Sequence, residues 1–103
     1  MKKSNYLHLV VTKPEDVEKL KFFCNHSVVL RSAYAFHSAI GNKRSHWHFV
    51  FMMKYFYNAE HYSKMIGISI LDSDLVHSFY EHKDYLISTT NRNDVLVVDG
   101  KQI

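Results

Sequence analysis

A chain of 103 residues, 47% of them hydrophobic and 15% aromatic, has enough apolar surface for one buried core but is too short for two domains. This composition excludes an intrinsically disordered or low-complexity chain. The net charge of +3 and the isoelectric point near 9.0 are compatible with a polyanionic partner, but they are not evidence for one.

The cysteine content and the hydrophobic runs bear on the compartment. The single cysteine, Cys24, excludes an internal disulfide framework and suits a reducing compartment. No apolar run approaches the roughly 20 residues that cross a bilayer, and the start "MKKSNYLHLVV" lacks the cleavage region of a secretory signal. We therefore expect an intracellular protein without a membrane partner.

The first expected elements are a strand and a helix. Residues 5–11, "NYLHLVV", form an apolar run typical of a strand. Thr12 and Glu15 have the spacing of a capping box, and Pro14 suits a first helical turn, so a helix should begin here. Apolar side chains recur at helical spacing as far as Cys24, which predicts one buried side.

The next two segments, residues 28–40 and 46–53, alternate with the period of two that is typical of strands. In each segment, aromatic side chains share one face. The other face carries His37 among alanines in the first segment, and His46 and His48 in the second. Two such strands in succession favour a β-hairpin.

The segment "IGNK", residues 40–43, fixes how these two strands pair. A glycine in the first central position of a two-residue loop suits a type II′ turn. The resulting register places His37 opposite His46 and the small residue Ala35 opposite His48, all on one face of the sheet. Three imidazoles should therefore converge on a surface that alanines keep clear.

The remaining elements complete an α+β domain. We expect a helix at 58–65, a short strand at 68–71, a helix from 72 or 73 to about 87, and a strand at 95–100. These elements form a single domain, residues 1–103, with a central antiparallel sheet. Its helices should pack on one face, against the aromatic side chains, and leave the histidine face open.

The converging histidines predict a metal site. Neutral imidazole is a common ligand for divalent ions, and cross-strand neighbours on one face point their side chains at a common position. We expect His37, His46 and His48 to hold Mn²⁺ or Mg²⁺, and Zn²⁺ less readily because no thiolate is near. Arg31, Lys43 and Arg44 are expected to contact phosphates; Lys43 and Arg44 lie in the hairpin segment.

The segment "SHWHFVF", residues 45–51, resembles the HUH motif, in which two histidines flank a bulky hydrophobic residue. This motif marks the rolling-circle replication initiators, or Rep endonucleases, and related enzymes. The order of "LHLVVT", His37, the two histidines and a tyrosine-bearing helix also matches, over essentially the whole chain. The chain is similar to the compact Rep nuclease domains of small circular single-stranded DNA viruses and related plasmids.

The resemblance implies a ferredoxin- or RRM-like fold and a metal-dependent endonuclease. Such enzymes nick single-stranded DNA at an origin stem-loop, leaving a 5′-phosphotyrosine link and a free 3′-hydroxyl, and can rejoin the strand. The domain would be a monomer in isolation and the N-terminal part of a longer initiator, with a helicase domain or host replication factors as partners. The location would be a host nucleus for a eukaryotic virus and otherwise the cytoplasm.

Two tyrosines are candidates for the nucleophile. "YLISTTNRNDVLVVDG", starting at Tyr85, reproduces the family's order of tyrosine, turn, strand and "DG", but has Ser88 where the Tyr-x-x-Lys motif has lysine. "YEHK" matches that motif literally from Tyr80 to Lys83, yet more helix follows it. We rank Tyr85 first and Tyr80 second, with Lys83 as a further DNA-binding residue, and Lys83 or His82 as a substitute for the missing lysine.

Three other interpretations remain open. The first is an HUH single-strand transposase, and the second is a non-catalytic α+β nucleic-acid-binding module. The third is a metal-sensing or zinc-storing domain, for which the three histidines would suffice. His8, His26 and His61 have no converging partner in the predicted arrangement and receive no role, and His77 and His82 are otherwise interpreted as surface or packing residues.

Overall fold

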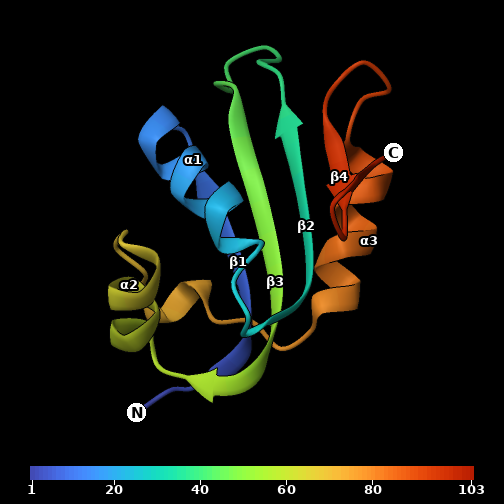
Figure 1. The fold of residues 1–103 in the computed structure, drawn as a ribbon. Helices are drawn as coiled ribbons and strands as arrows, with labels where there is room; N and C mark the ends of the chain where they lie inside the picture. The colour runs from blue at the N-terminus through green and yellow to red at the C-terminus, as the bar shows by residue number, and fades with distance from the viewer.

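A five-stranded antiparallel sheet forms the centre of the computed structural model, which describes all 103 residues (Figure 1). Its strands, in the order in which they lie side by side, are β1 (Ser4–Val11), β3 (His46–Tyr57), β2 (Val29–His37), β4 (Leu96–Val98) and β5 (Lys101–Gln102). The other elements are α1 (Pro14–Phe23), α2 (Ala59–Ile66), the 3-10 helix η1 (Asp72–Asp74) and α3 (Phe79–Thr89). The expected α+β class with a central antiparallel sheet is confirmed.

Helix α1 connects β1 to β2, and β3 lies between these two strands in the sheet. This is the split βαβ arrangement of ferredoxin-like folds. The last strands β4 and β5 then extend the sheet beside β2 rather than beside β1. In a ferredoxin-like order the final strand would lie beside the first. The likeness to that fold is therefore limited to β1, α1, β2 and β3.

None of the helices has both the length and the apolar character that are needed to cross a membrane.

The tight turn between β2 and β3 has the predicted form. Gly41 has a φ of 58° and Asn42 has no positive φ, which is the sign pattern of a type II′ turn. The backbones of Ile40 and Lys43 exchange hydrogen bonds of 3.0 and 3.3 Å. The predicted register is confirmed, because His37 lies opposite its expected partner in β3.

The two faces of the sheet carry separate clusters of buried residues. On the aromatic face, α1 and α2 cover the larger cluster, to which β3 contributes Phe49, Phe51 and Met53. On the other face, Phe79 and Leu86 of α3 are fully buried in a smaller cluster. The three helices thus lie on both faces and not on one, because the apolar side chains of α3 pack on Ala33, Ala35 and Val50 of the histidine face.

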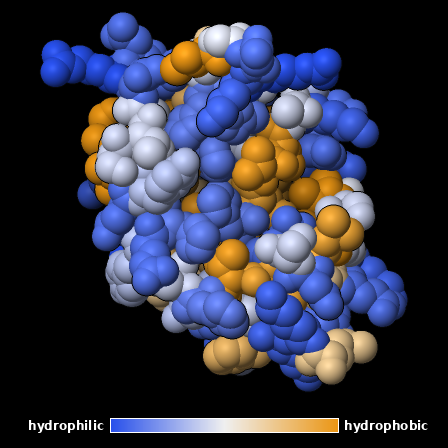
Figure 2. Space-filling model, turned by 180° about the vertical axis from the view of Figure 1, so that it is seen from behind, coloured by the Kyte–Doolittle hydropathy of each residue, from blue (hydrophilic) through white to orange (hydrophobic).

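The position of α3 depends on small residues in β2. Ala33 and Ala35 are fully buried, and both belong to the cluster that contains the inner side chains of α3. Their methyl groups leave room for a helix, so the face that was expected to be open is covered there. Seen from behind, the surface is mostly hydrophilic, with separate hydrophobic patches (Figure 2).

Several local predictions were wrong at the ends of elements. The N-cap of α1 is Lys13, without a side-chain hydrogen bond, so the capping box is absent although Pro14 does lie in the first turn. Residues 68–71 form no strand, and the backbone N–H of Ile70 donates a hydrogen bond to the Ser63 hydroxyl instead of to a neighbouring strand. Helix α3 begins only after Ser78, which caps it by accepting from the N–H of Glu81.

The last predicted strand is a small hairpin. Asp99 and Gly100 have φ values of 51° and 81°, which suit the two central positions of a type I′ turn. This turn joins β4 to β5 and pairs Val98 with Lys101. The "DG" pair therefore ends β4, because positive φ at two successive residues is incompatible with a continuing strand.

Candidate functional site

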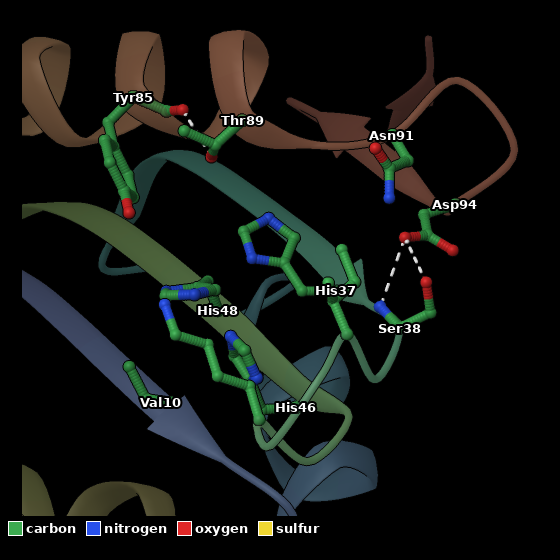
Figure 3. A pocket seen from close by; sticks show the side chains of 11 residues that line it. Val10, His37, Ser38, His46, His48, Tyr85, Thr89, Asn91 and Asp94 are labelled. Atoms are coloured by element: carbon green, nitrogen blue, oxygen red, sulfur yellow. Dashed lines mark hydrogen bonds between the residues drawn. The ribbon is translucent and has the colours of Figure 1, made fainter.

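Three histidines gather where β2 ends and β3 begins. Because the type II′ turn pairs the two strands closely, His37 and His46 lie directly opposite each other, and alternation brings His48 to the same face. Their ring centroids lie 4.6 to 5.2 Å apart. One nitrogen from each ring lies within 4.8 Å of the others, close enough for all three to bind one metal ion (Figure 3).

Each of these imidazoles is held by one of its ring nitrogens. The Nδ1–H of His46 donates to the carbonyl oxygen of Arg44 at 2.9 Å. The Nε2 of His37 lies 3.0 Å from the Thr90 hydroxyl, and the Nδ1 of His48 lies 2.9 Å from a ring nitrogen of His8. In each ring the second nitrogen has no hydrogen-bond partner in the protein and is available as a ligand atom.

The environment of His37 and His48 favours the neutral form of their rings, which is the form that binds metals. Burial, followed by the charges of His8, His37 and His46, lowers the pKa of His48 to about 3. The pKa of His37 is also lowered, by burial and then by His46, with Asp94 acting in the opposite sense. His37 and His48 therefore present lone pairs near neutral pH without first losing protons, and a set of three imidazole nitrogens fits a divalent ion.

His8 and His82 extend the histidine cluster. The sequence assigned no role to His8, and it predicted for His82 either a surface or packing role or a role as the substitute for the missing motif lysine. The Nε2 of His8 contacts Nδ1 of His48 at 2.9 Å, and its Nδ1 contacts Nδ1 of His82 at 2.8 Å. Burial, and then the charge of His82, lower the pKa of His8 to about 4. Alternation along β1 is the signal that could have found His8, but only once β1 is known to pair with β3.

A cavity of about 450 Å³ opens over the three histidines. Tyr85 lines this cavity from α3, with its hydroxyl directed toward the sheet, and is 53% exposed (Figure 3). The ring centroids of Tyr85 and His48 are 6.5 Å apart. Ser38 and Asp94 line another side, where the N–H and hydroxyl of Ser38 both donate to the Asp94 carboxylate.

The second candidate nucleophile, Tyr80, is not among the residues that line the cavity. Tyr85 is five positions further along the helix, which turns the two side chains roughly 140° apart around α3. Tyr80 instead lies beside Arg31, whose guanidinium carbon is 5.4 Å from the centroid of the Tyr80 ring. The Tyr80 residue is 52% exposed. Only the first-ranked tyrosine shares a cavity with the histidines.

The four predicted DNA-binding residues lie in different surroundings. Lys43 is the only lysine or arginine that lines the cavity, and Arg44 is exposed in the hairpin loop. Arg31 is held by Asp99, with N···O distances of 2.7 and 3.1 Å, and Lys83 pairs with its neighbour Asp84 at 3.3 Å. The structure thus places only Lys43 with the histidines.

The fold and this cavity define a small α+β protein with a candidate three-histidine metal centre beside an accessible tyrosine. The chain matches no protein-family model, no curated protein and no solved structure.

Proposed function

We propose that the chain is a metal-dependent endonuclease that nicks and rejoins single-stranded DNA, with Tyr85 as the nucleophile. The observation that carries the proposal is that Tyr85 and the histidines His37, His46 and His48 line one cavity although they come from α3 and the β2–β3 hairpin. A storage or sensing site needs the three histidines but not an accessible tyrosine above them. The single-stranded substrate, an origin stem-loop, follows from the resemblance to Rep nucleases.

The proposed reaction is a transesterification at phosphorus. The Tyr85 hydroxyl oxygen attacks the scissile phosphate and loses its proton to solvent, and the bond from phosphorus to the 3′ oxygen breaks. The 3′ oxygen takes up a proton and leaves as a free hydroxyl, while the 5′ phosphate stays on the tyrosine. The reverse attack by a 3′-hydroxyl rejoins the strand, so no external energy source is needed.

The three histidines would hold a divalent cation beside the scissile phosphate. Such a cation, when bound, withdraws charge from a nonbridging phosphate oxygen. Because every donor in the set is an imidazole nitrogen, and the set contains no carboxylate, Mn²⁺ suits it better than Mg²⁺. Zn²⁺ also binds imidazole well, and it is a useful probe of the same site.

Lys43 is the residue that we propose to contact the DNA backbone in the cavity. Its side chain extends from the turn that orients the histidines, so one hairpin would position both the cation and the phosphate. Ser88, which occupies the place of the motif lysine, donates to the backbone carbonyl of Tyr85 and does not line the cavity. Lys43 would therefore supply the positive charge that the motif lysine supplies in the family.

The decisive experiment is a search for a covalent protein–DNA adduct. The protein is incubated with Mn²⁺ and a panel of single-stranded stem-loop oligonucleotides, then separated under denaturing conditions. We expect a denaturation-resistant adduct and a released fragment with a 3′-hydroxyl. The adduct should be lost in Tyr85→Phe, in His46→Ala and after metal removal by EDTA.

Tyr80→Phe is the matched control, because Tyr80 lies on the same helix with almost the same exposure, 52% against 53%, but outside the cavity. This variant should retain the adduct. An adduct lost in Tyr80→Phe and kept in Tyr85→Phe would refute the assignment of Tyr85. Binding of metal and DNA without cleavage across the panel would instead favour a non-catalytic nucleic-acid-binding module.

A further inference from the structure

We propose that His8 and His82 are positioning residues that fix the tautomer of His48 and connect the metal site to helix α3. The three rings form a continuous chain, with contacts of 2.9 Å between His48 and His8 and 2.8 Å between His8 and His82. The inference rests on the metal site of the proposed function, but it is independent of any activity on DNA.

The geometry of the chain allows only two proton arrangements when all three rings are neutral. His8 uses both of its nitrogens, so it must donate through one and accept through the other. In the first arrangement, the Nδ1–H of His48 donates to Nε2 of His8, and the Nδ1–H of His8 donates to Nδ1 of His82. In the second, both bonds are reversed, and Nε2 of His48 carries the hydrogen.

Metal binding selects the first arrangement. Since Nδ1 of His48 is occupied by His8, the nitrogen that remains for a cation is Nε2, and it must then carry a lone pair. His48 consequently keeps its hydrogen on Nδ1, His8 becomes the acceptor at Nε2, and His82 carries its hydrogen on Nε2. One binding event thereby sets three tautomers, and a hydrogen bond to the outer nitrogen also makes His48 a stronger ligand.

The chain ends on the helix that carries the nucleophile. His82 lies three residues before Tyr85 in α3, so the two side chains are close neighbours on the helix surface. The other end of α3 is tied to the cluster by Thr90, whose hydroxyl contacts His37 at 3.0 Å. A bound cation should therefore restrain α3 at both ends and hold Tyr85 over the histidines.

Long-range ¹H–¹⁵N NMR of histidine side chains tests the tautomers directly. Protein labelled with ¹⁵N-histidine is titrated with Zn²⁺, a diamagnetic probe. We expect a Zn²⁺-bound Nε2 and an Nδ1–H at His48, an Nδ1–H at His8, and an Nε2–H at His82. An Nε2–H tautomer at His8 in the Zn²⁺-bound protein, or coordination of His48 through Nδ1, would overturn the inference.

Substitutions at His8 separate positioning from a merely structural role. His8→Gln places an amide oxygen near the position of Nε2, whereas His8→Leu offers no acceptor. We expect Zn²⁺ affinity to fall by roughly 10- to 100-fold in His8→Leu and to be largely restored in His8→Gln. His77→Gln is the control, because His77 is exposed and forms no side-chain hydrogen bond.

The melting temperature of the metal-free variants completes the test. A positioning role predicts that His8→Leu weakens Zn²⁺ binding at temperatures where the variant is fully folded, even though the loss of the partner of His48 Nδ1 lowers the melting temperature of the metal-free protein. A metal-free His8→Leu that melts lower, with unchanged Zn²⁺ affinity, would mean a structural role and refute the inference. If wild-type protein binds no Zn²⁺ or Mn²⁺, the metal site itself is refuted, whereas binding without a DNA adduct refutes only the endonuclease.

Discussion

His48 is 8% exposed, yet its ring is polar on two sides. A buried polar group is destabilising unless it has a partner, and His8 provides one for Nδ1. The other nitrogen has no partner within the protein, but it is not enclosed, because His48 lines the cavity and Asn5 Oδ1 is the only buried side-chain nitrogen or oxygen without a partner. This nitrogen is therefore the atom through which His48 could bind a cation together with His37 and His46.

The pKa values of His8 and His48 predict how the free energy of unfolding depends on pH. His8 and His48 have folded pKa values of about 4 and about 3, below the ordinary value of 6.5. As the pH falls below about 6.5, the unfolded chain takes up protons that the folded chain does not. The metal-free protein should thus lose stability toward about pH 5, by about 1.4 kcal/mol per pH unit for each proton.

Urea unfolding in EDTA between about pH 7 and about pH 5 measures this dependence, above the range in which most carboxylates titrate. The variant His8→Gln should have a shallower slope, because it removes one of the histidines whose folded pKa is lowered. His77→Gln should keep the slope of the wild type. A free energy of unfolding that is constant across this range would contradict the assigned pKa shifts.

At the scale of elements, the close approach of α3 to the sheet depends on alanines. Ala35 is fully buried, lies opposite His48 in β3, and packs in the cluster that holds Phe79 and Leu86. A longer side chain at this position would push the helix outward. Because Tyr85 is carried on the same helix, the alanine also sets the height of the tyrosine above the histidines.

We therefore expect Ala35→Leu to destabilise the fold by about 1–3 kcal/mol, since extra methylene groups have no space in a packed interior. Chemical unfolding measures the effect. Ala39→Leu is the comparison, because Ala39 is an exposed alanine in the same hairpin and should change stability by less than about 0.5 kcal/mol. Equal effects of the two substitutions would show that α3 does not pack closely on the alanines.

How much the sequence could predict depended on the distance between partners. The turn at Gly41 is local, so the register that brings His37, His46 and His48 together followed from four consecutive residues. Two other features were not local. One is the pairing of β1 with β3. The other is the hydrogen bond that the Ile70 N–H donates to the Ser63 hydroxyl of α2 rather than to a neighbouring strand.

His8 was missed for the same physical reason. Its alternation with Leu7 and Leu9 is visible in the sequence, but the face on which it lies matters only once β1 is paired with β3. His82 was interpreted as a surface or packing residue or as a substitute for the missing lysine, because the sequence did not specify where its helix lies relative to the histidines. Periodicity thus predicted the face of the element on which each side chain lies. The residues that these side chains contact depended on how the elements pack in the tertiary structure.

At the scale of the whole molecule, the histidine cluster joins parts of the chain that are far apart in sequence. The three candidate ligands come from β2 and β3, His8 adds β1, and His82 and Thr90 add the two ends of α3. A cation at this point would be a crosslink between the sheet and the helix on its histidine face. Because the unfolded chain does not present these residues together, metal binding should stabilise the folded state.

The stabilisation by a bound cation should depend on the concentration and the identity of the ion. At a concentration of free Mn²⁺ or Zn²⁺ about 100 times its dissociation constant, the gain is about 2.7 kcal/mol. For a domain of this size, the melting temperature should rise by roughly 10 to 20 °C. Mg²⁺ at the same concentration should raise it less, because imidazole is a poor ligand for Mg²⁺.

Thermal unfolding with and without EDTA measures this shift, and His46→Ala should abolish it. His46 is the suitable ligand to remove because it is only partly buried at the start of β3, so the loss of its ring leaves no enclosed cavity. His77→Ala controls for nonspecific binding to an exposed histidine and should retain the full shift. An equal rise in His46→Ala and in the wild type would place the stabilising ion elsewhere and refute the three-histidine centre.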